Sequence, residues 1–182
     1  MKALRTSAAL LPVVIAGCSG FNAADFKGAA PALVLEDYFL GDTVASGIFE
    51  DRFGRVRNQF SVAIAGTIVD GALVLDERFA YSDGKKDRRV WRIRRTGPNA
   101  YEGRAADVIG VARGAVQGNM LNWQYEMDLD IGYTVLRVHF DDWMFLQPTG
   151  MLINRARVSK FGIEIGSITL AFVKSAATAA PE

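Results

Sequence analysis

The sequence predicts an all-β protein: a single antiparallel up-and-down barrel, or barrel-like meander, of about nine or ten strands. Three observations predict this class. Apolar and polar residues alternate over short segments. Turn signals such as Asp83-Gly84 and Gly97-Pro98-Asn99 recur roughly every 10 to 15 residues, as in hairpin-rich folds. No long segment has the 3.6-residue period of a helix, which disfavours a parallel α/β fold.

The expected strands lie between these turns, where Gly and Asn supply the positive φ of tight hairpins and Pro presets a turn position. A single helical turn is expected near residues 35–40. An open sandwich built from the same strands is also compatible with these patterns. The alternation places strands at 73–82, 87–95, 101–106, 120–129, 133–141, 151–159 and 163–174.

The alternation also predicts which face of each strand is buried. In 120–129, large apolar residues such as Leu121, Trp123 and Tyr125 share one face, whereas Asn, Gln, Glu and Asp share the other. This pattern predicts a barrel with an apolar interior, either packed solid or holding a small apolar ligand. It is the reverse of the pattern in an outer-membrane porin, whose apolar residues face lipid.

The N-terminus reads as an export signal. Lys2 and Arg5 form a positive region, residues 8–16 are apolar and too short to span a bilayer, and Ile15-Ala16-Gly17-Cys18 resembles the bacterial lipobox. The alternative is an ordinary signal peptide with an incidental Cys. We expect a signal at 1–17, lipid attachment at Cys18, a flexible tether over 18–32, a barrel over 33–174 and a disordered tail over 175–182. By resemblance to lipoprotein sorting rules, the Ser after Cys18 favours the outer membrane, facing the periplasm.

The composition excludes several classes of function. With 21 basic and 20 acidic residues the formal charge is +1, so nucleic acid is not an expected partner. One Cys and one His leave no internal disulfide, Fe–S cluster or N/S zinc site. We therefore expect no metal, no cofactor and no catalytic residue. The lone His139 lies on a polar face without a Ser-based motif, so it is not expected to act as a catalyst.

Candidate ligand-binding residues are polar or aromatic side chains on the expected interior face and at strand ends. Glu77 lies on the otherwise apolar face of 73–81, so it pairs with an interior Arg, sits at the barrel mouth or anchors a ligand. Asp141 and Asp142 point to opposite faces and form no convergent acid–base pair. The candidates are Glu50, Arg52, Glu77, Trp123, Tyr125, Asp142, Trp143, Asn154, Arg155 and Lys160.

Several candidates also have a plainer explanation. Glu50 and Arg52 are suited to solvated cross-strand pairs. Trp143 is expected to plug the barrel end while Asp142 caps the chain or pairs with an Arg. Arg155 is suited either to carboxylate pairing or to holding a fatty-acid headgroup.

Seven basic residues fall within 85–95. Some of them alternate with Trp91 and Ile93, so this strand keeps an apolar face and presents a cationic one. In an exported, tethered protein such a patch fits anionic lipid headgroups, and a solvated charged hairpin is the alternative. The residues expected to contact headgroups are Lys85, Lys86, Arg88, Arg89, Arg92 and Arg94.

Five segments, taken together and in order, resemble the DUF3833 family of bacterial lipoproteins over about residues 33–174. The resemblance implies an exported lipoprotein with a calycin-like or lipocalin-like barrel, and it mildly favours a lipid-related role. It supplies no catalytic residue. The segments are Phe-Glu-Asp-Arg-Phe-Gly at 49–54, Gly-Pro-Asn-Ala-Tyr-Glu-Gly at 97–103, Phe-Asp-Asp-Trp-Met-Phe-Leu at 140–146, Leu-Ile-Asn-Arg-Ala at 152–156 and Ser-Lys-Phe-Gly at 159–162.

Three functions remain open from the sequence. The first is a membrane-anchored barrel that binds a fatty acid, lipid or other small apolar ligand. The second is a structural or interaction lipoprotein with a solid core. The third, a lipid-modifying enzyme, is the weakest because no nucleophile, base and orienting group occur together. Cavity volume separates the first two, since ligand pockets usually measure about 300–1,000 Å³.

Overall fold

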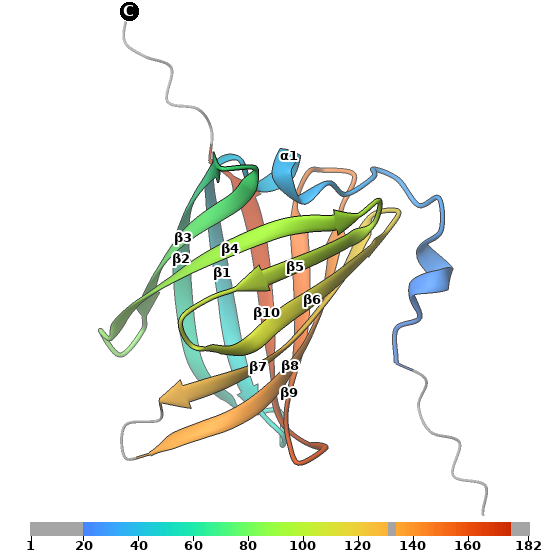
Figure 1. The fold of residues 1–182 in the computed structure, drawn as a ribbon. Coiled ribbons are helices and arrows are strands. Elements are labelled where there is room, and N and C mark those ends of the chain that lie inside the picture. Colours follow the sequence, from blue (N-terminus) through green and yellow to red (C-terminus); the bar gives the residue numbers. More distant parts are fainter. Residues whose placement is uncertain (1–19, 131–133, 176–182) are drawn as a thin grey trace, which may run out of the picture.

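The computed structural model describes residues 20–130 and 134–175, which form a closed antiparallel barrel of ten strands (Figure 1). Each strand pairs with the next one in sequence, and β1 pairs with β10 to close the sheet. The predicted all-β, up-and-down barrel is confirmed. The strands are β1 Gly41–Asp51, β2 Val56–Val69, β3 Ala72–Tyr81, β4 Lys86–Gly97, β5 Ala100–Arg104, β6 Val108–Gln117, β7 Met120–Asp130, β8 Val135–Leu146, β9 Leu152–Lys160 and β10 Ile163–Lys174.

Two-residue turns set the register of neighbouring strands. Asp70 and Gly71 join β2 to β3 with φ values of 49° and 69°, and Phe161 and Gly162 join β9 to β10 with φ values of 52° and 77°. Positive φ at both central residues is the geometry that matches the right-handed twist of the flanking strands. Glycine at the second position adopts it without strain.

Strand β8 is longer than the sequence predicted. It continues past Asp141 to Leu146 and stays paired with both β7 and β9. The two adjacent carboxylates do not end the strand, because Asp141 faces outward, where it accepts from Asn122 and Gln124, and Asp142 faces inward. A strand holds adjacent like charges when alternation sends them to opposite faces.

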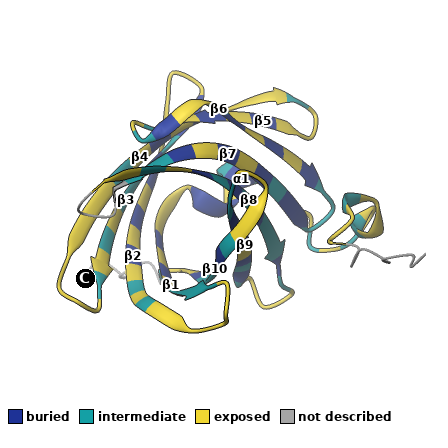
Figure 2. Cartoon of the chain, turned by 90° about the horizontal axis from the view of Figure 1, so that it is seen from below, coloured by how far each residue is buried: buried dark blue, intermediate teal, exposed yellow. Residues whose placement is uncertain are grey.

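One end of the barrel is covered by the short helix α1, Leu35–Phe39. Leu35, Tyr38 and Phe39 are buried, and the Tyr38 hydroxyl donates to the Phe172 carbonyl oxygen at 3.0 Å. Gly66 on β2 lets the helix approach, since a Cβ there would overlap the Phe39 carbonyl group. No helix of the described residues covers the opposite end, and Figure 2 looks into the barrel from that side.

The segment before α1 follows the outer wall of the barrel. It contains a short 3₁₀ helix, η1, Ala23–Phe26. The Phe21 ring lies 5.5 Å from the Trp143 ring, and the Phe26 ring lies 5.1 Å from the Phe145 ring. Residues 20–32 of the expected tether therefore contact the barrel through aromatic side chains.

The predicted signal at 1–17, Cys18 and residues 176–182 of the predicted tail lie outside the described residues. Within the described ranges, no helix is both long and apolar enough to cross a bilayer.

The alternation predicted the inward faces correctly. The side chains of the predicted apolar faces form one core, and two of its largest members, Trp91 and Trp123, lie with ring centroids 5.7 Å apart. Gly103 on β5 makes room for this pair, because a Cβ there would lie 2.6 Å from the Trp123 ring. The two indoles fill the barrel on the side of β4 to β7, and the remaining interior is left for a cavity.

Candidate functional site

A cavity of about 420 Å³ occupies the barrel interior. It extends from Leu35 and Phe39 of α1, at the covered end, to Asn58, Tyr81 and Lys85 near the open end. Cavities of about 300–1,000 Å³ accommodate small ligands. The barrel is therefore not packed solid, which removes the premise of the solid-core alternative.

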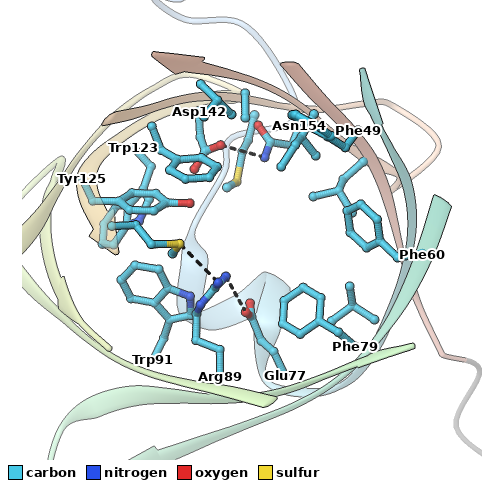
Figure 3. A pocket seen from close by; sticks show the side chains of 18 of the residues that line it. Phe49, Phe60, Glu77, Phe79, Arg89, Trp91, Trp123, Tyr125, Asp142 and Asn154 are labelled. Atoms are coloured by element: carbon cyan, nitrogen blue, oxygen red, sulfur yellow. Dashed lines mark hydrogen bonds and ion pairs between the residues drawn. The ribbon is translucent and has the colours of Figure 1, made fainter. Parts of the chain in front are cut away.

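Most of the cavity wall is apolar and aromatic (Figure 3). Phe49, Phe60 and Phe79 line one side, and Tyr125 lies across from them. The Tyr125 ring stacks on the Phe140 ring with centroids 4.9 Å apart and an interplanar angle of 4°. Rigid aromatic walls provide apolar contact area at little conformational cost, as in small-molecule sites.

An ion pair inside the barrel joins β3 to β4. Glu77 and Arg89 are direct cross-strand neighbours, with Arg89 Nη1 3.9 Å from Glu77 Oε2. Arg89 Nε also donates to Asp107 Oδ2 at 2.9 Å, and Arg89 Nη2 lies 3.4 Å from Met127 Sδ. Burial raises the pKa of Glu77 to about 7, although the charge of Arg89 opposes this rise.

A second polar group lies on β8 and β9. Asn154 Nδ2 donates to Asp142 Oδ1 at 3.2 Å, and both side chains are buried. Burial raises the pKa of Asp142 to about 6, against the stabilising hydrogen bonds from Asn154 and Tyr125. The same burial raises the pKa of the Tyr125 hydroxyl well above its usual value, so Tyr125 stays a neutral donor. Among the described residues, Asp142 forms no ion pair with a basic side chain.

Five of the ten predicted site residues line the cavity, and five do not. The structure brings together Glu77, Trp123, Tyr125, Asp142 and Asn154 around one interior space (Figure 3). These residues are inward-facing members of β3, β7, β8 and β9, far apart in sequence. They are the part of the prediction that the barrel assembles into a single site.

Trp143 and Arg155 face outward, so the expectation that Trp143 plugs the barrel end is wrong. The Trp143 indole N–H donates to Asp141 Oδ2 at 3.1 Å, and the Arg155 guanidinium lies 5.8 Å from the Phe21 ring centroid. Each residue directly follows an inward-facing one, Asp142 or Asn154, and the pleat turns it to the opposite face.

The remaining three candidates lie at the open end, outside the cavity lining. Glu50 and Arg52 belong to the β1–β2 hairpin, and Lys160 to the β9–β10 hairpin. Arg52 lies over the Phe53 ring at 4.9 Å, and Lys160 lies 5.3 Å from the Phe161 ring. Both aromatic rings are themselves exposed, so these cations belong to the rim of the barrel and not to its interior.

Arg89 does not belong to the cationic surface to which the sequence assigned it. Its side chain points into the cavity in step with Trp91 and Ile93 (Figure 3). Neighbouring Arg88 faces outward, where its guanidinium bonds Asp76 at 2.8 Å. The alternation of residues 89, 91 and 93 is the signal that could have assigned Arg89 to the interior.

Sequence reasoning also missed four cavity residues, Phe49, Asn58, Phe60 and Phe79. Phe49 begins the segment at 49–54 but was not chosen as a site residue. Aromatic and amide side chains on alternating strands do not distinguish a cavity wall from a packed core. Outside the site, His139 Nδ1 lies 2.9 Å from Glu126 Oε1 on the outer face. Within the described ranges, no group of three or more His, Cys, Asp or Glu side chains is arranged to hold a metal ion.

The closed up-and-down barrel with an internal cavity agrees with the calycin-like barrel that the family resemblance implies. The fold is similar to that of CPES, an S-type phycobiliprotein lyase from Guillardia theta, with a TM-score of 0.59 and 8% identity, over 79% of this chain and 92% of that chain. The chain belongs to the family described as protein of unknown function DUF3833, whose sequence model matches residues 12–174. A search of the curated proteins found no match.

Replacing Glu77 with glutamine is expected to remove a fall in stability between pH 6 and 8. Burial raises the folded-state pKa of Glu77 from 4.5 to about 7. As pH rises, the unfolded chain loses this proton first, so the free energy of unfolding falls until the pH passes the folded pKa. At about 1.4 kcal/mol per pKa unit, the native chain should lose about 1.4 kcal/mol more than the Glu77→Gln chain over this interval.

Urea unfolding at each pH measures the effect. Asp76→Asn is the control, because Asp76 is the outward-facing neighbour and its hydrogen bond with Arg88 lowers its pKa. Parallel pH profiles for the native and Glu77→Gln chains would contradict the prediction.

Proposed function

We propose that this protein is a membrane-anchored barrel that binds a small, mainly apolar molecule in its interior. The main support for this proposal is the cavity of about 420 Å³, which has aromatic walls and a few buried polar groups. Such a combination is the usual composition of a small-molecule site, in which apolar contacts supply affinity and polar groups set orientation. Likeness to the fold of a phycobiliprotein lyase is consistent with a barrel that holds a ligand.

The proposal includes a location in the bacterial envelope. Cys18 would carry the acyl chains and hold the barrel at the outer membrane, facing the periplasm. Anionic headgroups would contact the exposed basic residues of the β3–β4 region, a set that excludes Arg89 because its side chain faces the cavity. These residues are Lys85, Lys86, Arg88, Arg92 and Arg94.

A lipid-modifying enzyme has less support. Two carboxyl groups with raised pKa values, Glu77 and Asp142, line the cavity, and perturbed carboxyls are common in active sites. No Ser, Thr, Cys or His is among the described residues that line it. Acyl transfer through a side-chain hydroxyl, thiol or imidazole therefore has no support from the cavity wall.

Filling the cavity is expected to abolish binding of an apolar probe. Val62 is buried and lines the cavity, so Val62→Trp places an indole in the interior. We expect the full-length chain to bind the neutral dye Nile red with a fluorescence increase, and Val62→Trp to weaken this binding at least about tenfold through loss of buried apolar contact. Fluorescence titration measures both.

Ala63→Trp is the matched control, because Ala63 is the next residue on β2 and is exposed. This variant should bind the dye like the native chain. If the larger ring prevents folding, as judged by circular dichroism, Val62→Phe takes its place. The binding proposal fails if the native chain binds no dye, or if the inward and outward variants weaken binding equally.

A further inference from the structure

We propose that the ligand's polar end is a hydrogen-bond donor, best a protonated amine, and that Asp142 and Asn154 hold it inside the barrel. This inference rests on the proposed function, because it names the chemical class of the molecule that the cavity takes. An amphiphile with an amine at one end would place that amine against the Asp142–Asn154 pair and its chain along the aromatic wall. A fatty acid, one of the ligands that the sequence suggested, is disfavoured at this position.

The Asp142–Asn154 pair presents one acceptor, Asn154 Oδ1, that the described part of the chain does not satisfy. The two residues are only 4% and 3% exposed, and both line the cavity. Asn154 Nδ2 is committed to Asp142 Oδ1, which orients the amide and leaves Asn154 Oδ1 buried without a partner among the described residues. An unpaired buried acceptor costs free energy, so a donor supplied by a ligand is favoured here.

The charges around the cavity also favour a cation at this position. Arg89 is the basic group near the middle of the cavity, and it is already engaged by Asp107 at 2.9 Å and Glu77 at 3.9 Å. A ligand carboxylate next to Asp142 would therefore face a carboxyl group without a free cation among the described residues. An ammonium group would complete an ion pair with Asp142 in a site of low dielectric.

The protonation state of Asp142 sets the pH range in which it can form an ion pair with a ligand ammonium group. Burial raises the pKa of Asp142 to about 6, so its carboxyl group is mainly ionised at pH 7.5. The neutral Tyr125 hydroxyl faces the same carboxyl from β7, and Glu77 and Arg89 face it from β3 and β4 (Figure 3). An ammonium at this point would meet the ionised Asp142 carboxylate, whose hydrogen-bond donors Asn154 and Tyr125 are already in place.

A ligand bound in the opposite orientation, with its polar group at the open end, would contact a cation of the protein. Lys85 also lines the cavity, but it belongs to the exposed β3–β4 turn at the open end. A fatty acid would bind with its carboxylate at Lys85 and its chain directed inward. The two orientations predict opposite preferences for the ligand's end group, so ligands that differ only in that group distinguish them.

Displacement of Nile red from the full-length chain at pH 7.5 tests the proposal. The competitors are decan-1-amine, decan-1-ol and decanoic acid, which share one chain length. A charge-assisted hydrogen bond corresponds to a preference of about tenfold or more, so the amine should displace the dye at about one tenth of the concentration of the acid or the alcohol. Asp142→Asn should reduce the preference for the amine over the alcohol to about twofold or less.

Asp141→Asn is the matched control, since Asp141 is the adjacent carboxylate on the outer face and should leave the preference unchanged. If Asp142→Asn does not fold, Asn154→Leu replaces it and should also reduce the preference. Equal displacement by the amine and the acid overturns the amine proposal. So does stronger displacement by the acid that Lys85→Met abolishes. Neither result contradicts the proposal that the barrel binds an apolar molecule. Failure of Nile red to bind the native chain overturns the proposed function itself.

Discussion

Replacing Arg89 with methionine is expected to lower the free energy of unfolding by about 3 kcal/mol at pH 8, because it leaves a carboxylate inside the barrel without its cation. In the native chain Arg89 lies 3.9 Å from Glu77 and 2.9 Å from Asp107. The Arg89 side chain is only 20% exposed and that of Glu77 only 14%, so water screens their interaction weakly. Methionine keeps an unbranched apolar chain, so the loss reports the charge. Urea unfolding followed by circular dichroism measures it.

The loss should shrink as the pH is lowered to 5. Burial already raises the pKa of Glu77 to about 7, and without Arg89 the pKa rises further, so the carboxyl takes up a proton and no longer needs a cation. Adding Glu77→Gln to the Arg89→Met chain should recover most of the stability at pH 8. Arg88→Met is the control, because Arg88 pairs with Asp76 on the outer face and should cost far less. A loss that is independent of pH would contradict the prediction.

Replacing Gly66 with alanine is expected to cost about 3 kcal/mol and to loosen the helix that covers the barrel. A Cβ at Gly66 would overlap the Phe39 carbonyl group, and backbone cannot move aside as a flexible side chain can. Because Tyr38 and Phe39 are buried beside it, the strain should displace α1 from the end of the barrel. Urea unfolding reports the stability. Amide hydrogen exchange at Leu40, whose N–H donates to Glu36, reports the helix.

Gly97→Ala is the matched control for this change. Gly97 is also a strand residue with no need for positive φ, and a Cβ there would meet Ala100 at 3.4 Å, an ordinary contact. We expect its stability to remain within about 0.5 kcal/mol of the native chain, as for most surface substitutions. If Gly66→Ala is as stable as Gly97→Ala, α1 is not held in place by the close approach at Gly66.

Most of the fold could be predicted because a half-buried strand shows its two faces in the sequence. The period of two residues in 120–129 and 73–81 placed their apolar side chains inward, and the Asp-Gly and Gly-Pro-Asn turns separated the strands. The end of β8 was misjudged because Asp141 and Asp142 look like a break in an apolar strand. Alternation places one carboxylate on each face, so the strand continues.

The candidate site was predicted only in part, because the chemistry of a side chain does not by itself show which face of the strand it occupies. Glu77, Asp142 and Asn154 were selected because they are polar side chains in or next to apolar patterns, and the structure places all three in the cavity wall. Trp143 and Arg155 were chosen for their chemistry, although they are the outward-facing neighbours of Asp142 and Asn154. Arg89 was grouped with its basic neighbours, although it alternates in step with Trp91.

The sequence by itself determined the class of fold, the inward face of most strands and membership of the family, because each depends on local pattern or on motifs in order. Only the tertiary structure decided that the sheet closes through β1 and β10, that α1 covers one end, and that a cavity remains inside. Closure and free volume depend on how side chains from distant strands meet. Neither has a signature within a single strand, so the Glu77–Arg89 and Asp142–Asn154 contacts become visible only when the barrel is complete.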